Sequence, residues 1–248
     1  MHDETSQGAA PDEPTPERLV LDAEERRVIG VLIEKGLTTP QQYPMSLSAI
    51  VTACNQKSNR DPVTHYEEDQ VEEVLERLQA RELLSHFYPG EGGRVDRWRQ
   101  NLGTMFELRR AQLAIVGELL LRGAQAEGEL RQRASRMEPI ESRDALHELL
   151  RGLASSRPRW VVRLTPEGVA RGVRYTHACH AEGKLEAIVE AERAGDPARA
   201  PSSPSRSPSP PPAPSEVAAL NERIEALERR VASLEEALGG APEAGRSS

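Results

Sequence analysis

Residues 21–36 read LDAEERRVIGVLIEKG, and residues 108–123 read LRRAQLAIVGELLLRG. The second segment repeats the pattern of the first at an offset of 87 residues. The matched pairs include Gly30 with Gly117, Leu32 with Leu119 and Gly36 with Gly123, and aliphatic residues match at 28/115, 29/116 and 33/120. Shared glycines and a shared apolar pattern at a fixed offset predict a tandem duplication.

The first copy is predicted to form three helices followed by a hairpin. Asp22 is placed to cap the first helix, Ser46 begins the second, and Thr64 with Glu67 forms a capping-box pattern for the third. The run LLSHFYPGEGGRVDRWRQ (83–100) has two strand-forming stretches around a glycine-rich turn, which predicts a hairpin. Three helices and a hairpin in this order are typical of a winged helix.

The second copy repeats the same order of elements. Apolar spacing predicts helices at about 110–122, 127–136 and 143–154, and the run at 159–179 supplies a second hairpin. The predicted fold class is therefore mainly α with small β-hairpins, arranged as tandem winged-helix domains. The predicted domains are winged-helix domain 1 at 18–102 and winged-helix domain 2 at 103–184.

The flanking segments have different compositions. Residues 1–17 are polar and acidic and are expected to form a disordered tail, as are residues 240–248. Residues 185–215 are predicted to be a Pro/Ser-rich linker, because proline and serine dominate residues 196–215, DPARAPSSPSRSPSPPPAPS.

A C-terminal heptad pattern occupies residues 216–239. Branched residues and leucine alternate at spacings of three and four, which favours a parallel coiled coil and predicts a homodimer. The alternative is an amphipathic helix that folds back on its own chain. The seven core positions are Val217, Leu220, Ile224, Leu227, Val231, Leu234 and Leu238.

The composition of the chain argues against a membrane-spanning protein and against a disulfide-rich protein. No stretch approaches the roughly 20 consecutive apolar residues of a membrane span, and the N-terminus lacks the pattern of a signal peptide, so a cytoplasmic location without membrane contact is expected. Two cysteines cannot build a disulfide framework. The net charge is −8, yet residues 101–184 hold 14 bases against 10 acids. An acidic chain can therefore carry a local basic face.

Several runs resemble the YceH-like family of uncharacterised bacterial proteins. The runs are VIGVLIEKGLTTPQQYPMS (28–46), VTACNQKSNRDP (51–62), LLLRGAQ (119–125), GELRQRA (128–134), VVRL (161–164) and RYTH (174–177). The resemblance covers about residues 20–180 in order. It implies a tandem winged-helix fold, and it implies no established activity or catalytic residues.

Enzymatic chemistry is not expected. The sequence has no phosphate-binding, dinucleotide-binding, metalloprotease or serine-hydrolase motif, and no cofactor is predicted. His177, Cys179 and His180 form a small cluster in HACH, but they offer only three donors where a structural zinc site takes four. We therefore expect no metal.

Charge decides which parts of a winged helix can face DNA. The start of the first copy's third helix is Glu67, Glu68 and Asp69, and three more glutamates follow in the same helix, so its insertion into DNA would be repelled by phosphates. Arginines elsewhere suit phosphate contacts. The predicted DNA-binding residues are Lys57, Arg60, Arg94, Arg97, Arg99, Arg131, Arg133, Arg136, Arg163, Arg171 and Arg174.

The polar run at residues 55–60 has two interpretations. Its amide and basic side chains suit either base edges or a loop that fixes the second helix against the third. For the whole protein, the first hypothesis is a non-enzymatic, dimeric regulator that binds double-stranded DNA. The competing hypothesis is a scaffold that binds another protein through its winged-helix surfaces without DNA.

Overall fold

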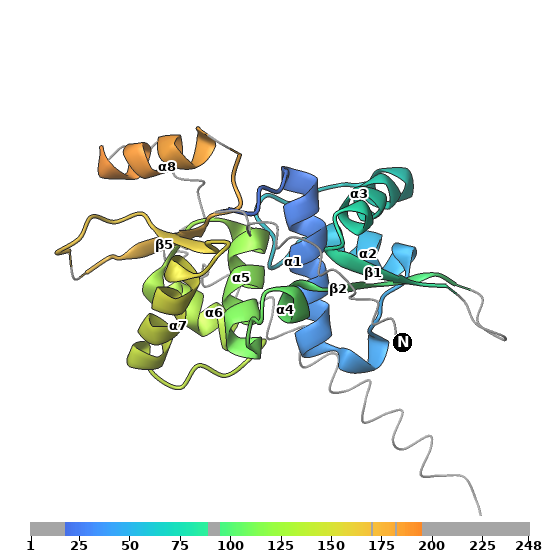
Figure 1. Ribbon diagram of the computed structural model, residues 1–248, viewed down its shortest axis with the longest axis horizontal. Coiled ribbons are helices and arrows are strands. Elements are labelled where there is room, and N and C mark those ends of the chain that lie inside the picture. The colour runs from blue at the N-terminus through green and yellow to red at the C-terminus, as the bar shows by residue number, and fades with distance from the viewer. Residues whose placement is uncertain (1–17, 89–94, 170, 182, 195–248) are drawn as a thin grey trace, which may run out of the picture. The chain divides into compact units, whose positions relative to one another are not determined.

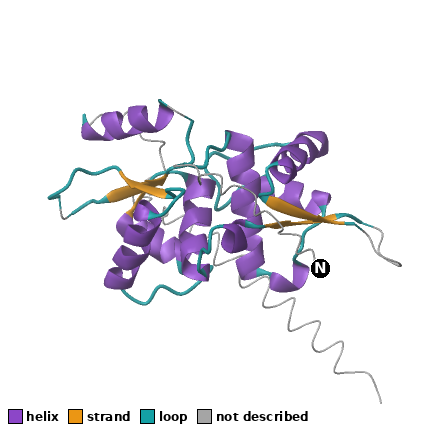
Figure 2. Ribbon diagram, in the orientation of Figure 1, coloured by secondary structure: helices purple, strands orange, loops and turns teal. Residues whose placement is uncertain are grey.

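The first repeat contains three main helices and a two-stranded antiparallel sheet (Figures 1 and 2). The computed structural model describes residues 18–88, 95–169, 171–181 and 183–194. The elements of this repeat are α1 (Ala23–Thr38), the short helix η1 (Pro40–Gln42), α2 (Leu47–Cys54), α3 (Glu68–Ala80), β1 (Leu84–Phe87) and β2 (Arg97–Gln100). The tails and the heptad segment 216–239 lie outside the described residues.

The second repeat has the same helix order and adds a strand. Its sheet is antiparallel throughout, in the order β3-β5-β4. The elements are α4 (Leu102–Met105), α5 (Arg110–Arg122), β3 (Gln125–Ala126), α6 (Glu127–Ala134), α7 (Arg143–Ser155), β4 (Val161–Arg163), β5 (Arg174–His177) and α8 (Lys184–Arg193). The described chain is thus mainly helical with small antiparallel hairpins, as the sequence predicts.

The linker begins later than the sequence predicts. Residues from 185 onward are expected to belong to the linker, whereas Lys184–Arg193 form α8. Leu185 is buried, and Arg18 forms an ion pair with Glu186 at 3.2 Å. These two contacts attach the helix to the folded part of the chain, which a reading of local composition does not reveal.

The third helix of the first repeat also begins later than predicted. α3 starts at Glu68, where the Glu67 N–H donates to Gln70 Oε1 at 3.0 Å. Thr64 does not cap the helix, because its hydroxyl donates to the Cys54 carbonyl at 3.1 Å and accepts from Arg27 at 3.2 Å. The threonine fixes the preceding loop instead.

In the hairpin of the first repeat, successive side chains of a strand point alternately into the core and to solvent. Trp98 on β2 lies opposite His86 on β1, and the two rings stack with centroids 4.6 Å apart. Trp98 is buried, while Arg97 and Arg99 on either side of it are exposed. Successive residues of a strand point to opposite faces, so one strand fills the core and also presents two guanidinium groups to solvent.

Helices α1 and α5 pack directly against each other and join the two repeats (Figure 1). A Cβ atom at Gly30 would lie 2.8 Å from Leu121 Cγ, and one at Gly117 would lie 2.7 Å from Ile33 Cγ2. Both distances are shorter than Cβ contacts allow, so the helices approach this closely only because both positions are glycine. Gly30 and Gly117 form one of the two glycine pairs that the repeat alignment matches.

The core is continuous across this contact. Buried side chains of both repeats, among them Val28, Ile29, Ile115 and Leu119, belong to one hydrophobic cluster. The limits of the two predicted domains, 18–102 and 103–184, stay a prediction, since the described residues share this core.

We expect alanine at either glycine of the crossing to destabilise the protein. Gly30→Ala and Gly117→Ala each overpack the contact, and overpacking typically costs about 1–3 kcal/mol. Gly117→Ala should cost more, because its new methyl group would meet β-branched Ile33, which has less freedom to move than Leu121. Urea unfolding followed by circular dichroism measures both changes.

Gly128→Ala is the matched control for these two variants. Gly128 lies in α6 with no atom within 4 Å of an added Cβ, so alanine there should leave stability unchanged or raise it by up to about 1 kcal/mol. Equal effects at all three positions would contradict the role of the crossing.

Candidate functional site

The polar run at residues 55–60 is mostly used inside the fold. The Asn55 side chain accepts from the Tyr66 N–H at 2.7 Å and donates to the Tyr66 carbonyl at 2.8 Å. Arg60 is buried, donating to the Ala53 carbonyl at 3.0 Å and forming an ion pair with Glu34 at 2.6 Å. Of the two interpretations, these contacts favour a structural loop for Asn55 and Arg60, and only Lys57 of the predicted DNA contacts here is exposed.

The same loop also contacts the second repeat. The Asp61 N–H donates to the Leu121 carbonyl at 3.0 Å, and the Arg122 guanidinium donates to Asn59 Oδ1. Arg122 additionally pairs with buried Glu118 at 3.1 Å, and burial raises the pKa of that carboxyl group to about 7. The loop therefore holds the two repeats together beside the α1–α5 contact.

The hairpin of the first repeat exposes two of the predicted arginines. The Arg99 guanidinium lies 5.1 Å from the centroid of the Phe87 ring, and Arg97 donates to the Pro44 carbonyl at 2.9 Å. Each of these contacts leaves most of a five-donor guanidinium group available. Arg94 lies outside the described residues.

The predicted arginines of the second repeat divide into two groups. Arg136 and Arg171 are exposed. The other four are partly buried and have partners in the fold: Arg131 donates to the Ile140 carbonyl, Arg133 to Gln125, Arg163 to the Val169 carbonyl and Arg174 to the Ala124 carbonyl.

The third helices of the two repeats differ in charge. The exposed face of α3 carries Glu68, Asp69, Glu72, Glu73 and Glu76 against Arg77 alone. The exposed positions of α7 are balanced: Arg143 and Arg151 offset Asp144 and Glu148. Only the helix of the first repeat therefore presents a strongly acidic face.

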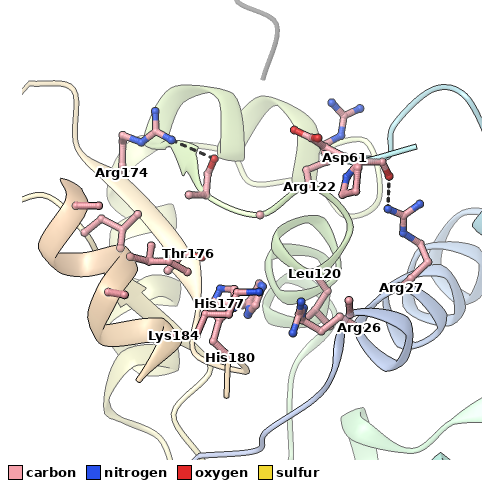
Figure 3. A pocket seen from close by; sticks show the side chains of 18 of the residues that line it. Arg26, Arg27, Asp61, Leu120, Arg122, Arg174, Thr176, His177, His180 and Lys184 are labelled. Carbon is pink, nitrogen blue, oxygen red and sulfur yellow. Dashed lines mark hydrogen bonds between the residues drawn. The ribbon is translucent and has the colours of Figure 1, made fainter. Parts of the chain in front are cut away.

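A cavity of about 480 Å³ lies where the two repeats and α8 meet (Figure 3). Its walls come from α1, the 61–66 loop, the end of α5, β5 and α8. Five cationic side chains line it against two carboxylates, Asp61 and Glu192. The cations are Arg26, Arg27, Arg122, Arg174 and Lys184.

His177 and His180 point into this hollow (Figure 3). Their rings stack with centroids 4.0 Å apart, both side chains are more than nine-tenths buried, and neither Nδ1 atom has a hydrogen-bond partner among the described residues. Burial lowers the pKa of His177 well below its usual value and that of His180 to about 4, with Arg26 and Lys184 adding to both shifts. Both imidazoles are neutral at pH 7.

The HACH cluster does not gather metal ligands. Cys179 is buried, and burial raises the pKa of its thiol to about 12, which makes it unreactive. Within the described residues, no group of three or more His, Cys, Asp or Glu side chains is placed to hold a metal ion. The histidines belong to the cavity instead.

The cavity itself was not predicted from the sequence. Its walls come from segments that begin near residues 23, 61, 120, 164, 174 and 184, so no local motif marks it. The one signal that points to it is the pair of histidines at the end of the second hairpin.

The described chain is a duplicated, mainly helical protein whose repeats pack through matched glycines. The chain belongs to the family described as "Protein of unknown function, DUF480", whose model matches residues 21–187. The YceH-like resemblance is thereby confirmed. In the described part of the chain, no helix combines the length and the apolar character needed to cross a membrane.

Relatives in several bacteria are similar over most of the described chain. UPF0502 protein Acid345_3645 of Koribacter versatilis is 45% identical over 64% of this chain and 73% of its own. A UPF0502 protein of Geotalea daltonii is 41% identical over 71% of this chain and 86% of its own. UPF0502 protein YceH of Salmonella newport is 45% identical over 63% and 75%, respectively.

We expect the two cavity histidines to make the protein sensitive to acid. The unfolded chain protonates histidine near pH 6.5, whereas the folded pKa of His180 is about 4. The unfolded state therefore binds more protons between these values, so the free energy of unfolding falls as the pH falls through this window. The His180 contribution is absent above about pH 7 and amounts to about 2 kcal/mol at pH 5.

Urea unfolding at about pH 7 and about pH 5 measures this effect in the wild type and in His180→Asn. The variant should lose less stability on acidification than the wild type. Gln79→Asn is the control, because Gln79 is exposed on α3 and carries no titratable group, so this variant should lose as much stability as the wild type. An equal loss of stability on acidification in all three proteins would contradict a lowered pKa of His180 in the folded protein.

Proposed function

We propose that the protein is a non-enzymatic, dimeric tandem winged-helix protein that binds double-stranded DNA and acts as a regulator. The observation that carries this proposal is that the hairpins of both repeats, the elements that would be the wings, carry exposed arginines. These are Arg97 and Arg99 on the first hairpin and Arg171 on the second. Arginine on a wing suits contact with phosphate oxygens, which gives affinity without reading sequence.

The second repeat is proposed to supply most of the contacts with the duplex. Its third helix, α7, is electrically balanced on its exposed side, and Arg136 lies exposed just after α6. The acidic face of α3 would meet phosphates at a cost of about 1 kcal/mol for each like-charged pair near 4 Å, even in water. We do not include Arg60 in the proposed surface, because its side chain is held inside the fold.

Neutralising Arg136 and Arg171 together should weaken binding to all duplexes alike. Each phosphate contact that is lost should also lower the slope of log affinity against log salt by about 0.9. Fluorescence anisotropy with a random duplex, in a salt series that begins at about 50 mM, measures both quantities. Gln is the replacement at each position, because it keeps much of the side-chain length without the charge.

The control replaces Glu68 by Gln and Asp69 by Asn at the start of α3, where binding should be unchanged or slightly stronger. The DNA proposal fails if the intact protein has no affinity for duplex at about 50 mM salt, where electrostatic binding is strongest. The acidic face of α3 favours a second function in that case, namely a scaffold that binds a cationic surface of another protein.

Removing residues 216–248 should convert a dimer into a monomer. The heptad core at residues 217–238 predicts parallel pairing, and Leu227→Pro should break it by interrupting the helix. Light scattering gives the mass of each protein. Unchanged mass in both variants would contradict the coiled-coil proposal, and Glu243→Gln, beyond the last heptad position, is the control that should remain dimeric.

A further inference from the structure

The cavity between the repeats gathers more positive charge than its own carboxylates balance. Arg26 and Arg27 come from α1, Arg122 from the end of α5, Arg174 from β5 and Lys184 from α8. Asp61 and Glu192 are the two acids in its lining. Glu118, just outside the lining, pairs with Arg122, so two positive charges remain after the three acids are counted. They surround a partly enclosed space, where water screens them less than at an open surface.

Internal hydrogen bonds use only part of the donor capacity of these cations. Arg26 donates to the Leu21 carbonyl at 2.6 Å, and Arg174 donates to the Ala124 carbonyl at 3.4 Å and lies 3.2 Å from Glu192. A guanidinium group has five N–H donors, so several remain on each. Lys184 is exposed at the start of α8.

The histidine pair adds an independent sign that the cavity is built to receive a ligand. His177 and His180 are more than nine-tenths buried, yet the Nδ1 atom of each lacks a partner in the described part of the chain. Buried polar atoms are almost always hydrogen-bonded, so two adjacent exceptions that line one hollow call for an acceptor or donor from outside the chain. Figure 3 shows the pair between Arg26 and Lys184.

Much of the remaining lining is apolar, beside the hydroxyl groups of Thr64, Tyr66 and Thr176. Leu120, Leu164 and Ile188 face the same space, together with small side chains at Ala187 and Ala191 on α8. A volume of about 480 Å³ falls within the range of about 300–1,000 Å³ that is usual for small-molecule sites. A ligand that satisfied both parts of this lining would have an apolar body and an anionic head.

We propose that this cavity binds a small organic anion, with its apolar body along Leu120, Leu164 and Ile188. Its carboxylate, sulfonate or phosphate group would lie between Arg26, Lys184 and the two histidines. This proposal does not rest on DNA binding, because it uses the interior of the repeat interface and none of the exposed hairpin arginines.

Two fluorescent probes with similar aromatic bodies test the proposal on the full chain. 8-Anilinonaphthalene-1-sulfonate carries an anionic group, and N-phenyl-1-naphthylamine does not. We expect one saturable site that binds the sulfonate at least about tenfold tighter, a difference of about 1.4 kcal/mol. The sulfonate should also raise the melting temperature, because a ligand of the native state stabilises it.

Two cavity variants separate the charge from the apolar walls. Lys184→Gln should weaken the sulfonate about fivefold and leave the neutral probe unchanged, while Ala191→Trp should fill the space and abolish binding of both. Arg151→Gln removes one positive charge from α7, away from the cavity, and should bind both probes as the wild type does.

The proposal is overturned if the wild type has no saturable site, if the two probes bind equally, or if Lys184→Gln binds the sulfonate unchanged. Partly unfolded proteins also bind this dye, but such binding lowers the melting temperature rather than raising it. The melting curve therefore distinguishes binding to the native cavity from binding to unfolded chain, even if Ala191→Trp folds poorly. Lys184→Gln changes only an exposed side chain.

Discussion

The close approach of α1 and α5 at Gly30 and Gly117 sets the arrangement of the rest of the described chain. Each glycine leaves room for a side chain of the opposite helix, Leu121 in one case and Ile33 in the other. The alignment of the repeats matches Gly30 with Gly117, but the side chains that meet them differ: Ile33 matches Leu120, whose Cβ lies 3.4 Å from an added Cβ at Gly30, whereas Leu121 is closer, at 2.8 Å. The duplicated chain thus packs its two repeats against each other through the same glycine position of each.

The 55–62 loop reinforces this arrangement with polar contacts. Arg60 fixes the loop to Glu34 on α1, and the backbone of Asp61 bonds to the end of α5. A buried arginine requires a paired acid, since an unpaired buried charge is costly. The polar residues that make this segment distinctive are therefore explained largely by the joining of the repeats, which leaves Lys57 as its exposed cation.

Local sequence patterns predict which segments form helices and strands, but they do not predict which distant residues these segments contact. Apolar periodicity located the main helices, and the alternation around Trp98 located the first hairpin. The start of α3 was wrong by a few residues because the Thr64 hydroxyl is used by Arg27 and Cys54, which are distant in sequence. The burial of Arg60 and the cavity depend on contacts between repeats, and a pattern within one segment carries no information about those contacts.

The position of the cavity connects the two proposals physically. Its walls include α1 from the first repeat, α5 and β5 from the second, and α8, so an anion bound there would contact all of them at once. A ligand shifts an equilibrium only by its difference in affinity between two arrangements, and a site shared by both repeats is sensitive to how they are placed. The exposed arginines of the two hairpins lie on different repeats, so their separation depends on that same placement. Because the glycine contact and the 55–62 loop hold the repeats in one arrangement, an anion held between Arg26 and Lys184 would stabilise that arrangement and the spacing of the two hairpins that goes with it.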